Sequence, residues 1–292
     1  MKVKKAVIPA AGFGTRFLPA SKSQPKEMLP IVDTPTIQYV VEEAVASGIR
    51  DILMIIGKGK RAIEEHFDRN FELENELEEA GKIAELKAIR RISNLADIHF
   101  IWQKEMNGLG DAVLHARHHV GREPFALLLG DTLIEAGSRP MTRQLLDVFA
   151  RYGESVVALE DVPRDKVGRY GIMSGEQMND DLYLVSDFIE KPTPKEAPST
   201  LAIAGRYIFT PEIFDYLADQ PPTKNKEIQL TDAMRRMVKQ HAMYGLRFKG
   251  TRYDIGNKLD FIKTNVMFGL HRPDMRKELL AFIQQISKTP LA

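Results

Sequence analysis

Short apolar runs recur along the 292-residue chain, separated by stretches that mix apolar and polar side chains. The runs are rich in β-branched residues and do not alternate between apolar and polar positions, which is typical of strands buried on both faces. The predicted strands are 7–10, 52–56, 98–102, 125–129, 156–159, 201–209 and 244–248. We therefore expect a sheet at the centre of the molecule.

Amphipathic stretches lie between these runs, and the expected helices are 36–47, 60–67, 112–119, 143–152, 211–219 and 228–241. Alternating strands and helices predict an α/β fold with a Rossmann-like, mainly parallel (mixed) central sheet flanked by helices. Ligands of such sheets bind beyond the carboxyl ends of the strands. A glycine-rich turn after the first strand and Asp131 after the fourth both fall at that edge.

Three segments depart from this alternation. Residues 70–94 carry acidic side chains first and basic side chains last, which complements a helix dipole, and Gly81 is expected to divide them into two helices. We interpret them as a solvated helical insertion, with an oligomer contact or a lid as the alternative. Residues 183–198 contain three prolines and predict an irregular connection. Residues from about 257 to 292 are expected to be a C-terminal helical portion of a single domain spanning 1–292.

Composition excludes several classes of protein. The net charge is +1, so no bulk electrostatic attraction to nucleic acid or anionic membrane is expected. The chain has no cysteine, which excludes disulfides, thiolate metal sites and a thiol nucleophile. Pro9, Gly12 and Gly14 interrupt the apolar run that follows the N-terminal lysines, and no stretch approaches the length of a membrane helix. We expect a cytoplasmic protein without membrane or nucleic-acid partners.

The glycine turn after the first strand carries the strongest chemical signal. Gly12 and Gly14 permit close approach of the backbone to a bulky ligand, and Arg16 and Lys26 add fixed positive charge. Oriented N–H groups and cationic side chains are what a triphosphate requires. Phe17 stands where the Rossmann fingerprint has its third small residue, and the chain has no P-loop Gly-Lys-Ser/Thr. The alternative is a tight turn with surface cations.

Eight ordered sequence blocks resemble the sugar-nucleotidyltransferase family, and most of all its uridylyl-transferring branch. The blocks are AAGFGTRFLP at 10–19, PKEMLP at 25–30, QKE at 103–105, GLG at 108–110, LGD at 129–131, VSDFIEKP at 185–192, EIQLTDA at 227–233 and YDIGNK at 253–258. The resemblance implies a nucleotidyltransferase (GT-A-like) fold. It also implies that UTP and α-D-glucose 1-phosphate are converted to UDP-glucose and pyrophosphate by direct in-line attack on the α-phosphorus.

The resemblance further implies roles for single residues. Arg16 and Lys26 would hold the departing phosphates, and the Gln103 amide, which can donate and accept together, would match the uracil imide edge. The same amide would accept thymine, so dTTP is an alternative substrate. Asp111 is a departure, because relatives often carry His there. The residues assigned to the nucleotide are Ala11, Gly12, Gly14, Glu27, Gln103 and Gly108.

Glu190 would accept hydrogen bonds from sugar hydroxyls, Lys191 would pair with the sugar phosphate, and the backbones of Gly171 and Ala204 would reach the remaining hydroxyls. An exposed Glu-Lys pair at a strand end is the structural alternative. No covalent nucleophile is required for this reaction, which depends on positioning and charge neutralisation.

By the same resemblance, Asp131 and Asp254 would hold Mg²⁺, which prefers carboxylate and phosphate oxygens. Each aspartate could instead cap a helix or turn. Thr132 stands where related uridylyltransferases usually carry a second Asp. The implied catalytic set is Arg16, Lys26, Lys191 and Asp131, and the implied assembly is a homodimer or homotetramer.

Other readings remain open. A transferase specific for another sugar would use the same residues, whereas a non-catalytic nucleotide-sugar sensor would have no leaving group for Arg16 and Lys26 to hold. A glycosyltransferase would normally carry an Asp-x-Asp metal pair, which is lacking at 130–133. We assign structural roles to the turn at 57–60, to Trp102 as a core residue, and to His115, His118 and His119 as a helix surface.

Overall fold

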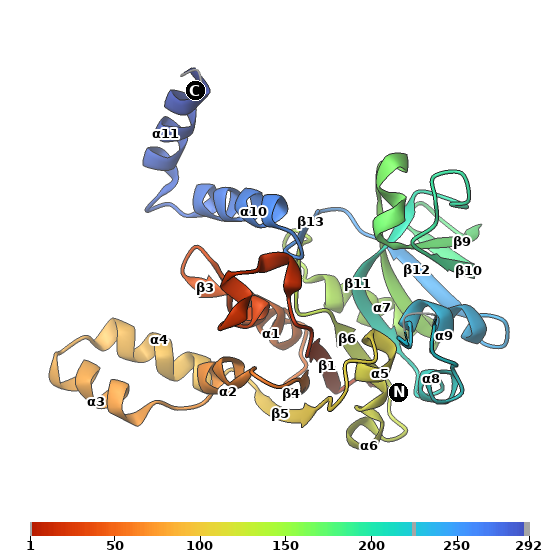
Figure 1. Ribbon diagram of the computed structural model, residues 1–292, viewed down its shortest axis with the longest axis horizontal. Coiled ribbons are helices and arrows are strands. Elements are labelled where there is room, and N and C mark those ends of the chain that lie inside the picture. The colour runs from red at the N-terminus through yellow and green to blue at the C-terminus, as the bar shows by residue number, and fades with distance from the viewer. Residues whose placement is uncertain (1, 224–225, 289–292) are drawn as a thin grey trace.

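A computed structural model describes residues 2–223 and 226–288 of the chain. Within these residues, one sheet contains nine strands. They are β1 (Lys5–Ala10), β4 (Asp51–Ile56), β5 (Asp97–Trp102), β6 (Phe125–Leu128), β8 (Ser155–Asp161), β9 (Gly171–Gln177), β10 (Leu182–Glu190), β11 (Leu201–Phe209) and β12 (Met243–Arg247). Their order across the sheet is β5-β4-β1-β6-β11-β8-β12-β10-β9 (Figure 1).

The sheet is mixed, as expected, but it is not mainly parallel: among the described residues four of its strand pairings are parallel, including β8 with β12, and five are antiparallel. β1 pairs in parallel with β4 and β6, and β4 pairs in parallel with β5. β11 then runs antiparallel to both β6 and β8, and β10 runs antiparallel to β12 and β9. The parallel pairings are therefore concentrated in the half that contains β1, whose strands all end at the same edge.

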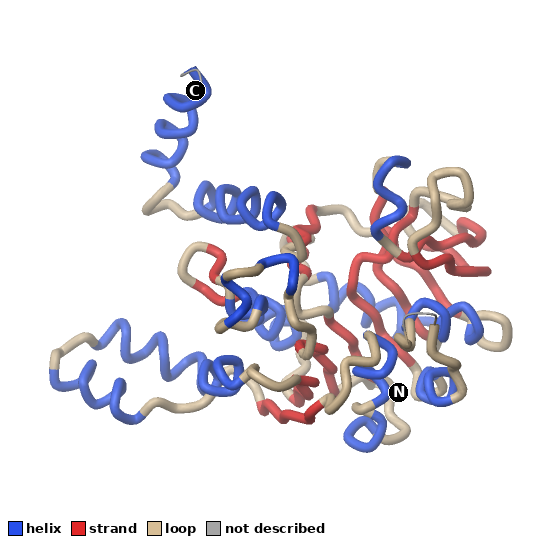
Figure 2. Tube along the Cα trace, viewed as in Figure 1, coloured by secondary structure: helices blue, strands red, loops and turns tan. Residues whose placement is uncertain are grey.

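Helices cover both faces of the sheet (Figure 2). The core on one face receives side chains from α1 and α7, including Ile37 and Leu145, and the core on the other face receives Val113 of α5 and Leu217 of α8. These arrangements confirm the predicted α/β class. The helices that pack on the sheet are α1 (Thr36–Ala46), α2 (Arg61–Phe67), α5 (Leu109–Leu114), α6 (Arg117–Val120), α7 (Met141–Tyr152), α8 (Ile213–Ala218) and α9 (Leu230–Met237).

Two helical pairs project from this body (Figure 1). The predicted insertion forms α3 (Phe71–Glu79) and α4 (Ile83–Ser93), separated at Gly81, whose φ is 67°. The C-terminal portion forms α10 (Lys258–His271) and α11 (Arg276–Lys288), while 289–292 lie outside the described residues. No described helix combines the length and apolar character needed to cross a bilayer.

Some sequence expectations were wrong. The helix expected at 112–119 is broken into α5 and α6, and at the break the Ala116 N–H donates to Val113 O, three residues back, as in a 3₁₀ turn. The segment 183–198 is irregular only after Glu190, since its prolines all follow that residue. Trp102 is 57% exposed, because it ends the edge strand β5.

Two small antiparallel pairs were not predicted. β7 (Thr132–Glu135) pairs with β13 (Thr251–Asp254), and β2 (Pro30–Ile31) pairs with β3 (Thr34–Pro35). These strands are two to four residues long, too short for a hydrophobic pattern to develop. The first pair matters for the site, because it brings residue 254 beside residue 132.

Candidate active site

The glycine turn leaves β1 at its carboxyl end and enters a short 3₁₀ helix, η1 (Thr15–Phe17). Gly14 adopts φ 65°, and a Cβ atom there would stand 3.0 Å from Lys26 Cβ, so the position needs glycine. A Cβ atom on Gly12 would meet nothing within 4 Å, which leaves this stretch of backbone open to an incoming ligand.

A cavity of about 520 Å³ lies against this turn, at the carboxyl ends of β1 and β6. It is also lined by Phe13, Met106 and Leu109, which supply an apolar wall. The predicted site residues that line it are Ala11, Gly12, Gly14, Lys26, Glu27, Gln103, Gly108 and Asp131. The structure therefore brings the expected nucleotide residues together with Lys26 and Asp131, whereas Arg16 and Asp254 are not part of the cavity lining.

Lys26 and Asp131 form an ion pair in this cavity, with 2.6 Å between Lys26 Nζ and Asp131 Oδ2. Their side chains are 19% and 27% exposed. Burial opposes both charges, but the attraction between them prevails: the pKa of Lys26 is raised above its ordinary value and the pKa of Asp131 is lowered. Both groups are thus ionised at neutral pH.

Lys60 was interpreted from the sequence only as part of a turn, but its side chain supports the glycine loop. Its ammonium donates to Gly12 O at 2.7 Å and to Glu27 Oε2 at 2.8 Å. Lys60 is 5% exposed and Glu27 is 1% exposed. Burial raises the pKa of Glu27 despite the opposing attraction of Lys60. From the protein interior, Glu27 thus pairs with Lys60 at 2.8 Å and lies 4.0 Å from Lys26, the two lysines beside the glycine turn.

Asp254 and Arg16 lie next to Asp131. Asp254 pairs with Thr132 across β13 and β7, and the N–H of Ile255 donates to Asp131 O at 3.1 Å. Asp254 Oδ1 accepts the Gly256 N–H at 2.9 Å, as expected of a turn-capping aspartate. A Cβ atom on Gly256 would stand 3.1 Å from Arg16 Nη1, and Arg16 contributes to lowering the pKa of Asp131.

Arg206 supports the loop that carries Asp131, a role that the sequence did not reveal. The Arg206 guanidinium is fully buried and donates to Leu129 O at 3.2 Å and to Thr132 O at 2.7 Å. Glu43 compensates its charge, with Oε2 at 2.8 Å from Nη2. A lone arginine within the apolar run 201–209 was the available signal.

At the other end of the cavity, both amide hydrogens of Gln103 are already used in hydrogen bonds within the protein. Its Nε2 donates to Asp111 Oδ2 at 2.6 Å and to Gly108 O at 3.2 Å. Because both partners can only accept, the orientation of the amide is defined, and no hydrogen bond from the described residues reaches Oε1. Gln103 thus presents an acceptor, rather than the donor and acceptor that we expected together.

Three of the predicted sugar residues, Gly171, Glu190 and Lys191, form a second group outside this cavity. Gly171 and Glu190 pair across β9 and β10, and a Cβ atom on Gly171 would stand 3.2 Å from Glu190 Oε2. Thr231 of α9, not assigned from the sequence, donates to that oxygen at 2.7 Å. Lys191 Nζ lies 3.2 Å from Glu190 Oε1, with its side chain 59% exposed. Ala204 is fully buried in β11.

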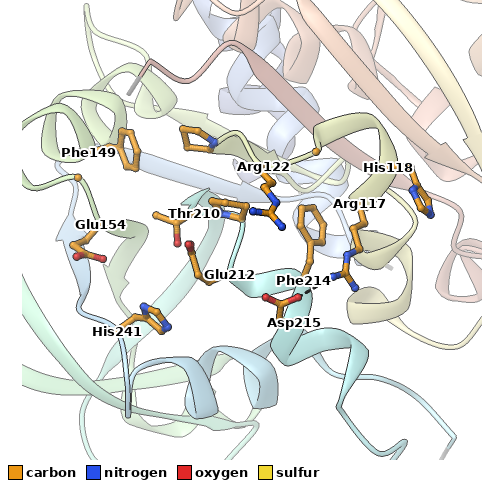
Figure 3. Close-up of a pocket in the computed structure, with 14 residues that line it drawn as sticks. Arg117, His118, Arg122, Phe149, Glu154, Thr210, Glu212, Phe214, Asp215 and His241 are labelled. Atoms are coloured by element: carbon orange, nitrogen blue, oxygen red, sulfur yellow. Dashed lines mark hydrogen bonds and ion pairs between the residues drawn. The ribbon is translucent and has the colours of Figure 1, made fainter.

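A larger cavity of about 970 Å³ contains none of the predicted site residues. Its lining includes Arg122 and His241, and Figure 3 shows Arg117 facing Asp215, with 2.8 Å between Arg117 Nη2 and Asp215 Oδ1. It lies where β6 and β8 begin, at the edge of the sheet opposite the glycine turn. The geometry therefore favours the smaller cavity as the active site.

Comparison with known proteins identifies the family of this chain. Residues 5–268 match the family described as Nucleotidyl transferase. The chain is 50% identical to UTP–glucose-1-phosphate uridylyltransferase 1 of Staphylococcus saprophyticus, over 99% of this chain and 100% of that protein. It is 51% identical to the UTP–glucose-1-phosphate uridylyltransferase of Bacillus subtilis, over 97% of each chain.

Solved structures give the same result. A UDP-glucose pyrophosphorylase complexed with UDP-glucose superposes with a TM-score of 0.85 at 41% identity, covering 92% of this chain and 100% of that one. A UTP-bound UGPase from Acinetobacter baumannii superposes with a TM-score of 0.89 at 37% identity, covering 99% of this chain and 100% of that one. The chain belongs to the nucleotidyl transferase family, in its group of UTP–glucose-1-phosphate uridylyltransferases.

Proposed function

We propose that this protein, acting as a single domain, converts UTP and α-D-glucose 1-phosphate to UDP-glucose and pyrophosphate by direct in-line attack on the α-phosphorus. The observation that carries the proposal is the Lys26–Asp131 ion pair beside the glycine turn. It supports the proposal because the cation proposed to bind phosphate and the carboxylate proposed to bind the metal line the same cavity. The Gln103 amide lines the same cavity, where a base would bind.

Asp131 and Asp254 would hold Mg²⁺. The donor set fits this ion, because two carboxylates from adjacent backbone segments offer hard oxygen ligands. The Lys26 ammonium at 2.6 Å from Asp131 Oδ2 lowers the pKa of this carboxyl, which supports a carboxylate able to bind a cation. When bound, Mg²⁺ neutralises charge on the phosphate oxygens and so favours attack at phosphorus.

The chain's own residues position the reacting groups. The open backbone at Gly12 lets N–H groups approach the triphosphate, while Arg16 and Lys26 neutralise the charge that develops on the leaving pyrophosphate. Lys191, at the carboxyl end of β10, orients the phosphate of the sugar for in-line attack. In this scheme the phosphate oxygen attacks directly, and no covalent enzyme intermediate is formed.

Gln103 would select the base through its Oε1 atom. Uracil and thymine each carry an N3–H that can donate to this acceptor, whereas cytosine has a lone pair at N3 and would face Oε1 with another acceptor. Because Asp111 and Gly108 occupy both Nε2 hydrogens, the amide cannot turn to suit cytosine without losing them. We infer that UTP and dTTP bind in preference to CTP.

Glucose would bind at the group formed by Glu190, Gly171 and Ala204. The Glu190 carboxylate accepts from Thr231 through Oε2, which fixes one oxygen and turns the carboxylate toward neighbouring sugar hydroxyls. A Cβ atom on Gly171 would stand 2.8 Å from Ile203 Cδ1 and 3.2 Å from that oxygen, so glycine lets the β9 backbone lie close to the carboxylate. A different stereochemistry at the hydroxyls would lose one of these hydrogen bonds, so glucose 1-phosphate is the proposed sugar substrate.

We further propose a cytoplasmic homodimer or homotetramer. Phe282 and Ile286 of α11, four positions apart and so on one face of the helix, are 57% and 45% exposed, and no described residue of that helix is buried. A helix with an apolar stripe gains stability from a covering surface, and a second copy would supply one.

Pyrophosphate release tests the proposed function. Glucose 1-phosphate and Mg²⁺ are incubated with the enzyme and UTP, dTTP, ATP, CTP or GTP in parallel. Release mainly with UTP supports the proposal, and release mainly with dTTP moves the base preference to thymine. Binding of UDP-glucose without pyrophosphate release from any nucleotide would make the protein a sensor and overturn the proposal.

A further inference from the structure

A cluster of Asp51, His99 and His119 lies at the edge of the sheet opposite the glycine turn, where β4 begins. Asp51 is the first residue of β4, so the cluster sits at the amino end of the strand whose carboxyl end borders the active site. His99 lies in β5 opposite Leu53, and because strand residues alternate between faces, His99 shares a face with Leu53 and Asp51. Helix α6 covers that face and adds His119.

The three side chains converge on a small volume. Asp51 Oδ1 lies 3.0 Å from His119 Nε2 and 3.8 Å from His99 Nε2, and one ligand atom from each residue lies within 4.8 Å of the others. Ligand atoms bound tetrahedrally to Zn²⁺ at about 2.0–2.2 Å are separated by roughly 3.3–3.6 Å. A shift of about 1 Å in these side chains, with a metal ion replacing the proton in the hydrogen bond between His119 Nε2 and Asp51 Oδ1, therefore converts the cluster into three ligands of one ion.

We propose that Asp51, His99 and His119 bind one divalent transition-metal ion of the Zn²⁺ class. Two imidazoles and a carboxylate match the ligands of Zn²⁺, Co²⁺ and Ni²⁺, whereas Mg²⁺ and Ca²⁺ prefer oxygen donors alone. The ion joins the edge strand β5 to β4 and to α6, with water completing the coordination. His115 and His118 take no part, since the ligands come from three separate elements and not from one helix face.

Neighbouring residues fix the helix that carries His119 and limit the repulsion of an incoming cation. Lys5 Nζ donates to His119 O at 2.9 Å, which fixes the end of α6, and Glu123 at 2.9 Å offsets the lysine charge. A compensated lysine repels an incoming cation less than an unpaired one. The side chains of His99 and Asp51 are 54% and 35% exposed, so an ion reaches them from solvent without unfolding.

Calorimetric titration of the full chain with Zn²⁺ tests the proposal. We expect one site per chain that is weakened by more than about tenfold in both His99→Ala and His119→Ala, because even indirect partners of a metal ligand change affinity by roughly 10- to 100-fold. His118→Ala, the matched control on the same helix, should bind as the wild type does. Asp131→Asn, which alters the active-site carboxylate, should retain this site as well.

Thermal unfolding gives a second readout. Saturating Zn²⁺ should raise the melting temperature of the wild type and of His118→Ala, but not that of His99→Ala or His99→Gln. Equal zinc affinity or equal thermal shifts in the wild type and the His99 variants would overturn the proposal. So would loss of the site in Asp131→Asn with retention in His99→Ala, which would place the ion in the active site.

Discussion

The Lys26 ammonium lies 2.6 Å from Asp131 Oδ2, so the cation proposed to hold the leaving phosphates neutralises the carboxylate proposed to hold the metal. A triphosphate would draw Lys26 away and expose Asp131 to a divalent cation, and the cation in turn would release Lys26 to the phosphates. We therefore expect nucleotide and metal to bind with positive coupling, each strengthening the affinity for the other.

Asp131→Asn should reduce turnover by roughly 100- to 1,000-fold, since it removes a charged group that acts on the reacting phosphates. Pyrophosphate release at saturating UTP and glucose 1-phosphate measures the effect, with circular dichroism to confirm folding. The exposed Asp165→Asn is the matched control and should retain full activity. Near-normal turnover of a folded Asp131→Asn would show that the metal assignment is wrong.

The same ion pair predicts how stability depends on pH. The pKa of Asp131 is lowered from 3.8, so its stabilising effect is complete above that pH and is lost as pH falls through the native pKa. The pKa of Lys26 is raised from 10.5, so its stabilising effect is complete below that pH and is lost as pH rises through the native pKa.

Lys26→Met removes the pair and leaves Asp131 unpaired. The difference in melting temperature between wild type and Lys26→Met should be constant near neutral pH. It should shrink below pH 3.8 and above pH 10.5, the unperturbed pKa values of the two groups. A difference that stays the same at both extremes would contradict a stabilising role for the pair.

Lys60→Met should destabilise the fold by about 3–5 kcal/mol, because it leaves the Glu27 carboxylate buried without its partner. It also removes the donor to Gly12 O, so the KM for UTP should rise. Urea unfolding and UTP titration measure the two effects. Lys58→Met, at an exposed neighbour, is the control, and the double variant Lys60→Met/Glu27→Gln should recover most of the lost stability. A fully stable single variant would mean that the pair does not anchor the loop.

Asp111→Ala should weaken discrimination between UTP and CTP by roughly 10- to 100-fold, since a hydrogen bond to a charged group of about 1.5–3 kcal/mol no longer orients Gln103. The ratio of kcat/KM values for the two nucleotides measures it. Asp111→Asn keeps an acceptor and should restore much of the discrimination. If pyrophosphate is released but its nucleotide preference is unchanged in Asp111→Ala, Gln103 is oriented by other groups.

Thr231→Val should raise the KM for glucose 1-phosphate by roughly tenfold and leave the KM for UTP unchanged, because it removes the hydroxyl that orients Glu190 while preserving side-chain shape. Initial rates with each substrate varied in turn separate the two constants. Thr231→Ser keeps the hydroxyl and should behave as the wild type does. Equal effects on both substrates would indicate a general loss of folding.

The sequence predicted the central strands well, because burial on both faces gives each of them a continuous apolar run. β7 and β13 were missed because strands of four residues with mixed side chains leave no periodic signal. β9 was missed for a similar reason, since GIMSGEQ has glycine at its first and fifth positions and ends in polar residues. The topology of the antiparallel half therefore became visible only in the structure.

The same contrast holds for the site. Gly12, Gly14 and Asp131 were predictable because they follow buried strands directly, at the edge where ligands bind. Lys60 and Arg206 were not, because each acts through a partner remote in sequence: 33 residues separate Lys60 from Glu27, and 163 separate Arg206 from Glu43. Sequence patterns report local geometry, and these contacts depend on how the strands are ordered.

Strand β11 connects the two halves of the site. At Arg206–Phe209 it pairs with β6, which leads to Asp131, and at Ala202 it touches Ile172 of β9, which begins at the sugar group. Between these two contacts the strand is irregular, because its register with β8 shifts between Ile203 and Tyr207 and Gly205 adopts φ 74°. The spacing between the two substrates therefore depends on a local irregularity in β11. A single insertion or deletion between 202 and 206 would displace the sugar group relative to Asp131.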